Sequence, residues 1–239
     1  MYIFLLQNFG AQLILALYIS LILYNFYDIF KVDKISPTLM KVSPDEFDET
    51  VQELLKATNL QDKVYKDVTS EETNAALVGF ESSARIEIYG KFDSLPSSQR
   101  NSILLHEIGH AKDHSLLKKL IVYFGLFYLE MIIILYLHNT ASHEFKCNNV
   151  ARDSSFILLS IVYFLALRDW LLMFYKLSSQ RAEIAADLIT KNSGFAGELA
   201  KSLLSISVTE ISYIKPTWLY NALYAMHPSI YDRVEYLLK

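Results

Sequence analysis

The longest apolar stretches of the chain predict helices that cross a membrane. Residues 1–27 contain no charged residue, and two later apolar runs, residues 120–137 and 156–177, contain only a few charges. A helix needs about 20 predominantly apolar residues to cross the hydrocarbon core of a bilayer. We therefore predict three transmembrane helices. Buried helices of a soluble protein are the alternative for the two later runs, because both carry charge and are near the minimum length.

The first run predicts a membrane anchor that is retained. Residues 1–27 begin without the Lys/Arg patch of a signal peptide and have no small-residue cleavage site after a short apolar core. A cleaved signal peptide is the alternative.

The charges inside the two later runs predict an ion pair. Charged residues within a span usually face other helices and pair with one another. If the two runs form an antiparallel hairpin, Glu130 lies near the level of Arg168, and we predict that the two pair.

Three spans place residues 28–119 and 178–239 on one side of the membrane and the short loop 138–155 on the other. Of the 22 Lys and Arg residues, only Lys146 and Arg152 lie in that loop. The basic residues that flank the spans on the opposite side are Lys31, Lys34, Lys118, Lys119, Lys176 and Arg181. The positive-inside rule therefore predicts that the two large segments face the cytosol.

The composition supports a membrane protein. Hydrophobic residues make up 52% of the chain and the mean hydropathy is +0.23, which is more apolar than an ordinary soluble domain. The formal net charge of −4 argues against a nucleic-acid partner. Cys147 is the single cysteine, which excludes an intrachain disulfide and a zinc site built from cysteines.

The first large segment, residues 28–119, predicts two strands and an amphipathic helix. NAALVGF (74–80) and RIEIYG (85–90) are β-type runs separated by ESSA, which predicts a β-hairpin over residues 74–90. An exposed strand edge there would hydrogen-bond an extended peptide. Residues 43–60 open with Ser-Pro and acidic residues and then place apolar residues at i, i+3 and i+4, which predicts an N-capped amphipathic helix.

The sequence HEIGH places two histidines four residues apart on a predicted helix, residues 102–119. Residues four apart lie on one face of a helix, so His106 and His110 can present their imidazoles to one metal ion. Glu107 points to the adjacent side, where it can take a proton from a water molecule on the metal. The pattern predicts a catalytic zinc site, and a solvated polar helix face is the alternative.

A catalytic zinc needs a third protein ligand. His114 is excluded, because on a continuing helix it lies two turns, roughly 12 Å, from His106. A glutamate from a second helix is the other solution, and QRAEIAADLI offers Glu183, with Asp187 one turn further on. Two predicted spans separate Glu183 from the histidines, so all three lie on the same side of the membrane. An ordinary exposed helix carboxylate is the alternative for Glu183.

Four motifs occur in a specific order. They are NAALVGF (74–80), HEIGHAKDH (106–114), EIAAD (183–187) and HPSIYDRVEYL (227–237). They resemble the N-A-x-x-x-G, H-E-x-G-H, E-x-x-x-D and H-P-S-x-x-x-R motifs of the CAAX prenyl protease type 1 family, membrane zinc peptidases related to the bacterial heat-shock membrane metalloproteases. The resemblance implies a mainly α integral membrane protein with a gluzincin-type zinc peptidase domain that contains a small β-hairpin or sheet.

The resemblance also implies roles for individual residues. His106, His110 and Glu183 would bind one Zn²⁺ ion, and Glu107 would activate the zinc-bound water as the nucleophile. His227 would donate a hydrogen bond to the oxyanion that forms on the peptide carbonyl. A capping or packing histidine is the alternative for His227.

Three further residues match the motifs with less specific roles. Asp187 would orient a zinc ligand, and Arg233 would pair with Asp187 or with another carboxylate. Asn74 would contact the substrate, whereas a plain structural strand is the alternative for the run that contains it.

The activity that the resemblance implies is hydrolysis near the C-terminus of a prenylated CAAX protein, in the membrane of the endoplasmic reticulum with the site facing the cytosol. Two alternatives stay open: a general quality-control metalloprotease of membrane proteins, and a truncated paralogue that binds zinc without catalysis. The family's eukaryotic members have seven spans around an interior chamber, whereas three are predicted here. A second chain that supplies the missing helices is therefore a further possible partner, besides the prenylated substrate and membrane lipid.

Overall fold

The computed structural model describes residues 16, 19–24, 27, 35–70, 74–80, 83–145, 149–209 and 213–239. Within these residues the chain is mainly helical with one small mixed sheet. It divides into two compact units, one made of the described residues before Lys31 with Leu120–Tyr175, the other of the described residues of Val32–Lys119 with Lys176–Lys239. Most of the first predicted span, residues 1–27, lies outside the described residues, as do Lys31, Lys34, Lys146 and Cys147.

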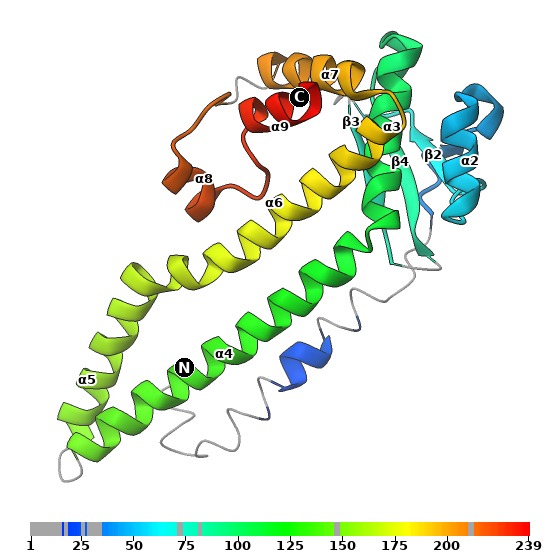
Figure 1. Cartoon of the computed structure of the whole chain (residues 1–239). Coiled ribbons are helices and arrows are strands. Elements are labelled where there is room, and N and C mark those ends of the chain that lie inside the picture. Colours follow the sequence, from blue (N-terminus) through cyan, green and yellow to red (C-terminus); the bar gives the residue numbers. More distant parts are fainter. Residues whose placement is uncertain are drawn as a thin grey trace. The chain divides into compact units, whose positions relative to one another are not determined.

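The sheet of the second unit contains four strands in the order β1-β2-β4-β3. The strands are β1 (Leu39–Lys41), β2 (Val64–Asp67), β3 (Asn74–Val78) and β4 (Arg85–Tyr89). β3 and β4 pair antiparallel, as the predicted hairpin requires, and β2 pairs parallel with β4 and antiparallel with β1. β3 is therefore an edge strand of the described sheet (Figure 1).

Helices α2 (Glu49–Ala57) and α3 (Ser97–Lys112) share one apolar core with the sheet. The core includes Val51 and Leu55 of α2, Leu104, Leu105 and Ile108 of α3, and Val64, Ile86 and Ile88 of the strands. Helical spacing in α2 and α3 and the two-residue alternation in β4 bring these side chains to common faces. The core fixes the position of α3 against the sheet.

The helix predicted over residues 43–60 is shorter than expected. Pro44–Glu46 forms a 3₁₀ turn, Phe47 is extended, and α2 begins only after Asp48. The Asp48 side chain accepts a hydrogen bond from the backbone N–H of Thr50, so Asp48 is the N-cap and Ser43 is not. The amphipathic helix therefore starts after Asp48, closer to its apolar positions, and not at the Ser-Pro sequence that was predicted to start it.

The prediction of a single helix over residues 102–119 is wrong. Helix α3 ends at Lys112, and α4 (Ser115–Glu144) begins after a turn. His114 has φ +51°, a left-handed conformation that breaks the helix. The carboxylate of Asp113 accepts hydrogen bonds from the Ser115 hydroxyl and the Lys118 ammonium, which hold the start of α4. The break separates the proposed metal-binding helix from the apolar helix that follows.

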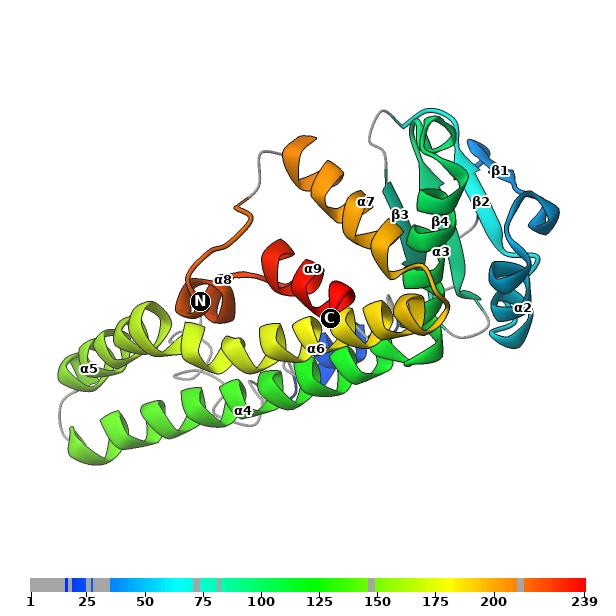
Figure 2. The same cartoon turned by 45° about the horizontal axis from the view of Figure 1, so that its top comes forward.

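The remaining helices of the second unit are the C-terminal part of α6 (Arg168–Asn192), α7 (Ala196–Thr209), α8 (Trp218–Tyr224) and α9 (Ile230–Leu238). α7 packs against α9 and against α3 (Figure 2). Leu199, Leu203 and Leu237 form part of the small apolar cluster between α7 and α9. These contacts bring the C-terminal motif to the helix that carries the histidines.

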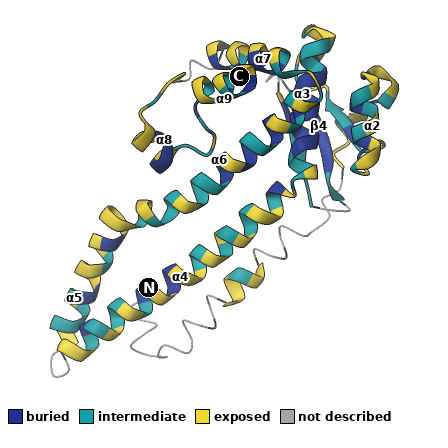
Figure 3. Cartoon of the chain, viewed as in Figure 1, coloured by how far each residue is buried: buried dark blue, intermediate teal, exposed yellow. Residues whose placement is uncertain are grey.

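Two described helices are long and apolar enough to cross a membrane, Ser115–Glu144 and Asn149–Asn192. The second comprises α5 (Asn149–Val162), a π-helical turn (Tyr163–Leu167) and α6. Only 11% of the most apolar window of each is buried, which differs from the core helix of a soluble protein (Figure 3). Their predicted apolar runs lie within these helices.

The two helices are antiparallel neighbours within the first unit. The rings of His138 and Phe156 lie 5.4 Å apart, and Arg168 Nε lies 2.7 Å from Glu130 Oε1, which confirms the predicted ion pair. The predicted loop 138–155 is shorter than expected, because α4 continues to Glu144 and α5 begins at Asn149. Polar residues in that stretch are compatible with a helix, and no glycine or proline interrupts them.

Candidate active site

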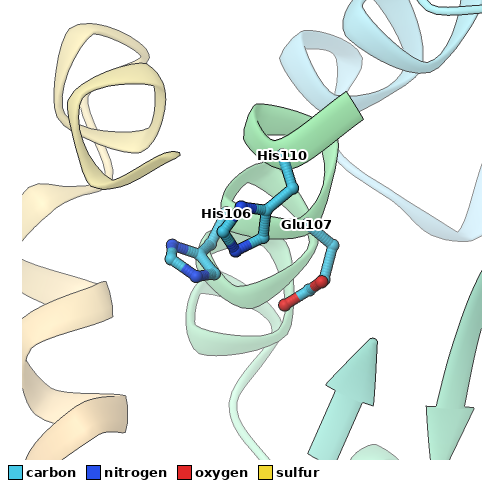
Figure 4. Close-up of side chains that lie close together, drawn as sticks. All are labelled: His106, Glu107 and His110. Carbon is cyan, nitrogen blue, oxygen red and sulfur yellow. The ribbon is translucent and has the colours of Figure 1, made fainter. Parts of the chain in front are cut away.

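Helix α3 presents His106 and His110 on one face and Glu107 on the adjacent face. The two imidazole centroids lie 4.7 Å apart with an angle of 80° between the rings (Figure 4). His106 and Glu107 are buried and His110 is half-buried. Ligand atoms of all three lie within 4.8 Å of one another. The spacing of HEIGH therefore produces the predicted cluster.

Glu183 of α6 reaches both histidines. Its Oε2 lies 3.3 Å from His106 Nε2, and its Oε1 lies 3.4 Å from His110 Nε2. Ligand atoms bound tetrahedrally to one zinc at about 2.0–2.1 Å are roughly 3.3–3.5 Å apart. Each of the two nitrogen–oxygen distances matches the spacing of a pair of zinc ligands, although they involve different oxygens of the carboxylate. Glu183 is buried and is not an ordinary exposed carboxylate.

Glu107 belongs to a different part of the cluster. Its Oε2 accepts a hydrogen bond of 2.8 Å from the backbone N–H of Leu77, on the outer side of the edge strand β3. The contact holds the Glu107 carboxylate on the side of α3 next to the sheet (Figure 4). Burial raises the pKa of Glu107 above its usual range. A carboxylate with a raised pKa beside a metal site is suited to accept a proton.

Asp187 and Arg233 orient His106. His106 Nδ1 lies 2.9 Å from Asp187 Oδ1, which leaves Nε2 of the same ring directed at Glu183. Arg233 of α9 donates two hydrogen bonds to Asp187, from Nε and Nη2. A carboxylate on the second ring nitrogen of a metal-binding histidine fixes its tautomer and orientation. The predicted pairing of Arg233 with a carboxylate is confirmed for Asp187, and Arg233 Nη1 also lies 3.5 Å from Glu183 Oε2.

The protonation of the cluster follows from these contacts. Burial alone lowers the pKa of His106, but hydrogen bonds with Asp187 and Glu183 raise it to about 9. Burial and the nearby charge of His106 lower the pKa of His110 to about 3. Burial raises the pKa of Glu183, but hydrogen bonds from His106 and His227 hold it well below its usual range. Glu183 is therefore ionised and His110 neutral, the forms in which these groups bind metals, whereas His106 carries a proton that it would have to release to bind one.

Ser115 is a site residue that the sequence did not reveal. Its hydroxyl lies 3.3 Å from His110 Nδ1 and donates to Asp113 Oδ2 at 3.1 Å. His110 therefore has its own polar partner, as His106 has Asp187. The prediction of one unbroken helix concealed this contact, because the turn at Asp113 and His114 is what directs Ser115 back toward His110.

A cavity of about 670 Å³ opens beside the cluster, and Asn74, Glu107, His227 and Lys119 are among its lining residues. His227 Nδ1 lies 3.2 Å from Glu183 Oε2, although 66% of the His227 side chain is exposed. Asn74 is exposed at the start of β3. All the residues predicted for the site therefore lie around one cavity, except Asp187, which is fully buried behind His106.

These features define the site of a metallopeptidase: two histidines on one helix, a glutamate between them, and a third carboxylate from a second helix. Residues 43–239 match peptidase family M48, and the chain belongs to this family. Peptidases of family M48 are zinc metalloproteases. The resemblance inferred from the four motifs is confirmed at this level.

Among solved structures, that of Ste24p from S. mikatae is similar to this chain, with a TM-score of 0.70 and 18% sequence identity. The similarity covers 99% of this chain and 61% of Ste24p, so the chain spans about three fifths of the length of that protein. At this identity the likeness is one of fold. No curated protein matches the chain.

Proposed function

We propose that the chain is a zinc-dependent endopeptidase of the membrane, with one Zn²⁺ ion held by His106, His110 and Glu183. The observation that carries the proposal is the position of Glu183, whose two oxygens lie 3.3 Å and 3.4 Å from the two histidine nitrogens. Three protein ligands leave a fourth position open, as catalytic zinc requires.

When bound, zinc would polarise the substrate carbonyl and make a water molecule more acidic. Glu107 accepts the proton of the attacking water and passes it to the leaving amine, while the Leu77 N–H holds the carboxylate in place. His227 reaches into the cavity and donates a hydrogen bond to the oxyanion that develops on the carbonyl oxygen. Asp187 and Arg233 keep the His106 ring in its binding orientation.

The substrate binds as an extended peptide along the outer edge of β3. This edge faces the cavity through Asn74, Ala75, Ala76 and Leu77. The Leu77 N–H is occupied by Glu107, so the other outward main-chain groups of the edge would hold the peptide, largely independently of its side chains. Asn74 contacts the peptide beside the reacting bond. We propose the C-terminus of a prenylated CAAX protein as the substrate, because the Ste24p fold covers nearly the whole chain.

The proposed setting is a membrane, with the site on its cytosolic side and the endoplasmic reticulum as the organelle. Two described helices have the length and composition of spans, and residues 1–27 supply a third. A second chain is proposed as a partner that contributes further helices to the walls of the site. These features would give a lipid-modified C-terminus access to the cavity.

The test compares the wild-type chain with Glu107→Gln in detergent, measuring bound zinc and cleavage of a farnesylated CAAX peptide. Glutamine keeps an oxygen for the Leu77 N–H but cannot accept a proton. We expect one zinc per chain in both proteins and a rate that is roughly 100 to 10,000 times lower in the variant. Removal of zinc with a chelator should abolish cleavage by the wild type, and added zinc should restore it.

The same assay separates the rival functions when an unprenylated peptide of identical sequence is included. Cleavage that depends on the prenyl group supports the CAAX substrate, whereas equal cleavage of both peptides favours membrane-protein quality control. Zinc binding without turnover in either protein favours a zinc-binding protein or the need for a second chain. Absence of zinc from the wild-type chain contradicts the proposal.

A further inference from the structure

An aromatic surface lies next to the cavity, on α8 and the segment before it. We define it by its exposed residues Tyr213, Trp218, Leu219, Tyr220 and Tyr224. Tyr213 is 78% exposed, Trp218 75% and Tyr224 57%. The second turn of α8 is buried through Asn221, Ala222 and Leu223. Among the described residues, α8 thus combines an exposed first turn with a largely buried second turn (Figure 3), and large aromatic side chains account for most of the exposed positions.

Helix α8 is attached to α6 over a single helical turn. Gln180 donates hydrogen bonds of 2.9 Å to the carbonyls of Asn221 and Ala225, and the Asn221 side chain donates one back at 3.3 Å. One turn earlier, Lys176 donates to the carbonyl of Leu223, and its ammonium lies 5.4 Å from the ring of Tyr224. These bonds fix α8 beside residues 176–180 of α6.

This attachment point is where the apolar part of α6 ends. The apolar run 156–177 closes with Lys176, and the next residues of the helix include Gln180 and Arg181. In a membrane helix, the change from apolar to basic residues marks the boundary between hydrocarbon and headgroups. Because α8 is hydrogen-bonded to residues 176–180 of α6, we expect α8 to lie at the boundary between hydrocarbon and headgroups.

The chemistry of the aromatic surface fits the same boundary. Trp and Tyr rings are enriched at the level of the lipid headgroups, where one end of the ring is apolar and the other is wet. Residues 213–226 contain no acidic residue, and their charge comes from Lys215, whose ammonium lies 3.7 Å from the Tyr231 ring centroid. This segment therefore carries no negative charge that anionic lipid headgroups would repel.

We propose that the aromatic surface of α8 lies in the headgroup region of the membrane that the apolar part of α6 enters. This rests on the membrane insertion proposed above, but not on peptidase activity. Tyr213 and Tyr220 also line the cavity, and His227 follows α8 by three residues. Anchoring α8 at the lipid surface therefore brings the opening of the cavity to the height at which a lipid-anchored C-terminus leaves the bilayer.

The two tryptophans of the chain make the proposal measurable. Trp170→Phe leaves Trp218 as the sole tryptophan, and Trp218→Phe leaves Trp170, inside the apolar run, as the control. The full chain is reconstituted into phosphatidylcholine vesicles with lipids brominated either near the headgroup or deep in the acyl chain. Iodide in the buffer reports on exposure to water.

We expect Trp218 to be quenched most by lipids brominated near the headgroup, and Trp170 by lipids brominated deep in the chain. Quenching of Trp218 by iodide but by neither bromolipid would mean that the surface faces water. Protection from both kinds of quencher would mean that a second copy or another protein covers it. Either result overturns the proposal, as does quenching of Trp218 mainly by deep bromines. If lipids brominated deep in the acyl chain do not quench Trp170, the proposed membrane insertion itself is contradicted.

A nitroxide label provides a second route that does not depend on tryptophan. Tyr224→Cys in a Cys147→Ser background carries the label on the exposed side of α8. We expect relaxation enhancement by both oxygen and a water-soluble nickel complex, at the ratio typical of the headgroup region. A label at an exposed position of α2, such as Glu53→Cys, provides the reference for a water-exposed site. The same oxygen-to-nickel ratio of relaxation enhancement at Tyr224→Cys would contradict the proposal.

Discussion

Arg233 binds the carboxylate of Asp187 with two hydrogen bonds, 2.8 Å from Nε to Oδ2 and 2.7 Å from Nη2 to Oδ1. Both side chains are almost fully buried. The same carboxylate contacts His106 Nδ1 at 2.9 Å. Residues from the C-terminal motif and from the E-x-x-x-D motif are thus connected directly to a proposed zinc ligand, and each connection can be removed separately.

Asp187→Ala should weaken zinc binding and destabilise the fold for different reasons. Loss of the acceptor for His106 should lower zinc affinity roughly 10–100-fold. Arg233 would lose both of its hydrogen bonds to Asp187 and keep only its 3.5 Å contact with Glu183 Oε2, at a cost of up to about 3–5 kcal/mol. Competition with a chromogenic chelator measures the first effect, and unfolding of the metal-free protein measures the second.

The double variant Asp187→Ala/Arg233→Met is the control for this pair. Removing the buried guanidinium that has lost Asp187 should recover much of the stability, while zinc affinity should stay low because His106 still lacks its acceptor. Recovery of both properties together would show that Asp187 acts only through stability.

Gly109 allows α3 and α6 to approach closely. A Cβ atom at this position would lie 2.8 Å from Ala186 Cα and 3.1 Å from Ala186 Cβ. Ala186 stands directly before Asp187 and three residues after Glu183. Gly109→Ala should therefore separate Glu183 from the two histidines. We expect a loss of stability of about 1–3 kcal/mol from overpacking, together with weaker zinc binding.

Gly197→Ala in α7 is the matched control for Gly109→Ala. A Cβ atom there would meet no described atom within 4 Å. Because alanine favours a helix over glycine, this variant should be neutral or more stable by up to about 1 kcal/mol, with unchanged zinc affinity. Both variants raise helix propensity, so a difference between them measures the close helix contact. Equal behaviour would contradict the role given to Gly109.

Ser115→Ala removes the hydroxyl that connects His110 to Asp113. We expect zinc affinity to fall by roughly 10-fold or more, because the His110 ring loses the group that fixes its orientation. Exchange of zinc against a chelator, followed at several pH values, measures the effect. Ser115→Thr keeps the hydroxyl and should retain most of the affinity, whereas equal losses in both variants would indicate disturbed packing.

The sequence predicted the elements of the site that depend on short-range geometry. Helical spacing alone brings His106 beside His110 and turns Glu107 to the next face. The approach of Glu183 was inferred from the even number of crossings and from the family motif, because its distance from the histidines depends on packing between remote segments. Gly109 contributes to that packing, yet a glycine inside HEIGH carries no signal of what it will contact.

The missed features have local causes. β1 and β2 are three and four residues long, and their polar residues hide the alternation that identifies longer strands. The break before α4 has no glycine or proline to announce it, because His114 adopts a conformation that glycine usually provides. The prediction of one helix over residues 102–119 therefore placed Ser115 inside a continuous helix, whereas the structure places it at the start of α4.

The ion pair between Glu130 and Arg168 should determine how α4 and the α5–α6 helix pair within the first unit. Glu130 is 8% exposed and also lies within 3.4 Å of the Tyr163 hydroxyl. Arg168 follows the π-helical turn Tyr163–Leu167, and the wider turn changes the direction of the side chains after it. In an apolar setting each charge depends on the other for compensation.

Arg168→Met and Glu130→Gln should each destabilise the helix pair, and the double variant should lose less than the sum of the two. The expected coupling is roughly 0.5–3 kcal/mol. Reversible unfolding in mixed lipid and detergent micelles measures the four free energies. Tyr128→Phe, at an exposed position of α4 two residues before Glu130, is the control and should change little. Strict additivity of the two single effects would mean that the pair does not hold the helices together, and that each residue is instead kept by the surrounding apolar contacts.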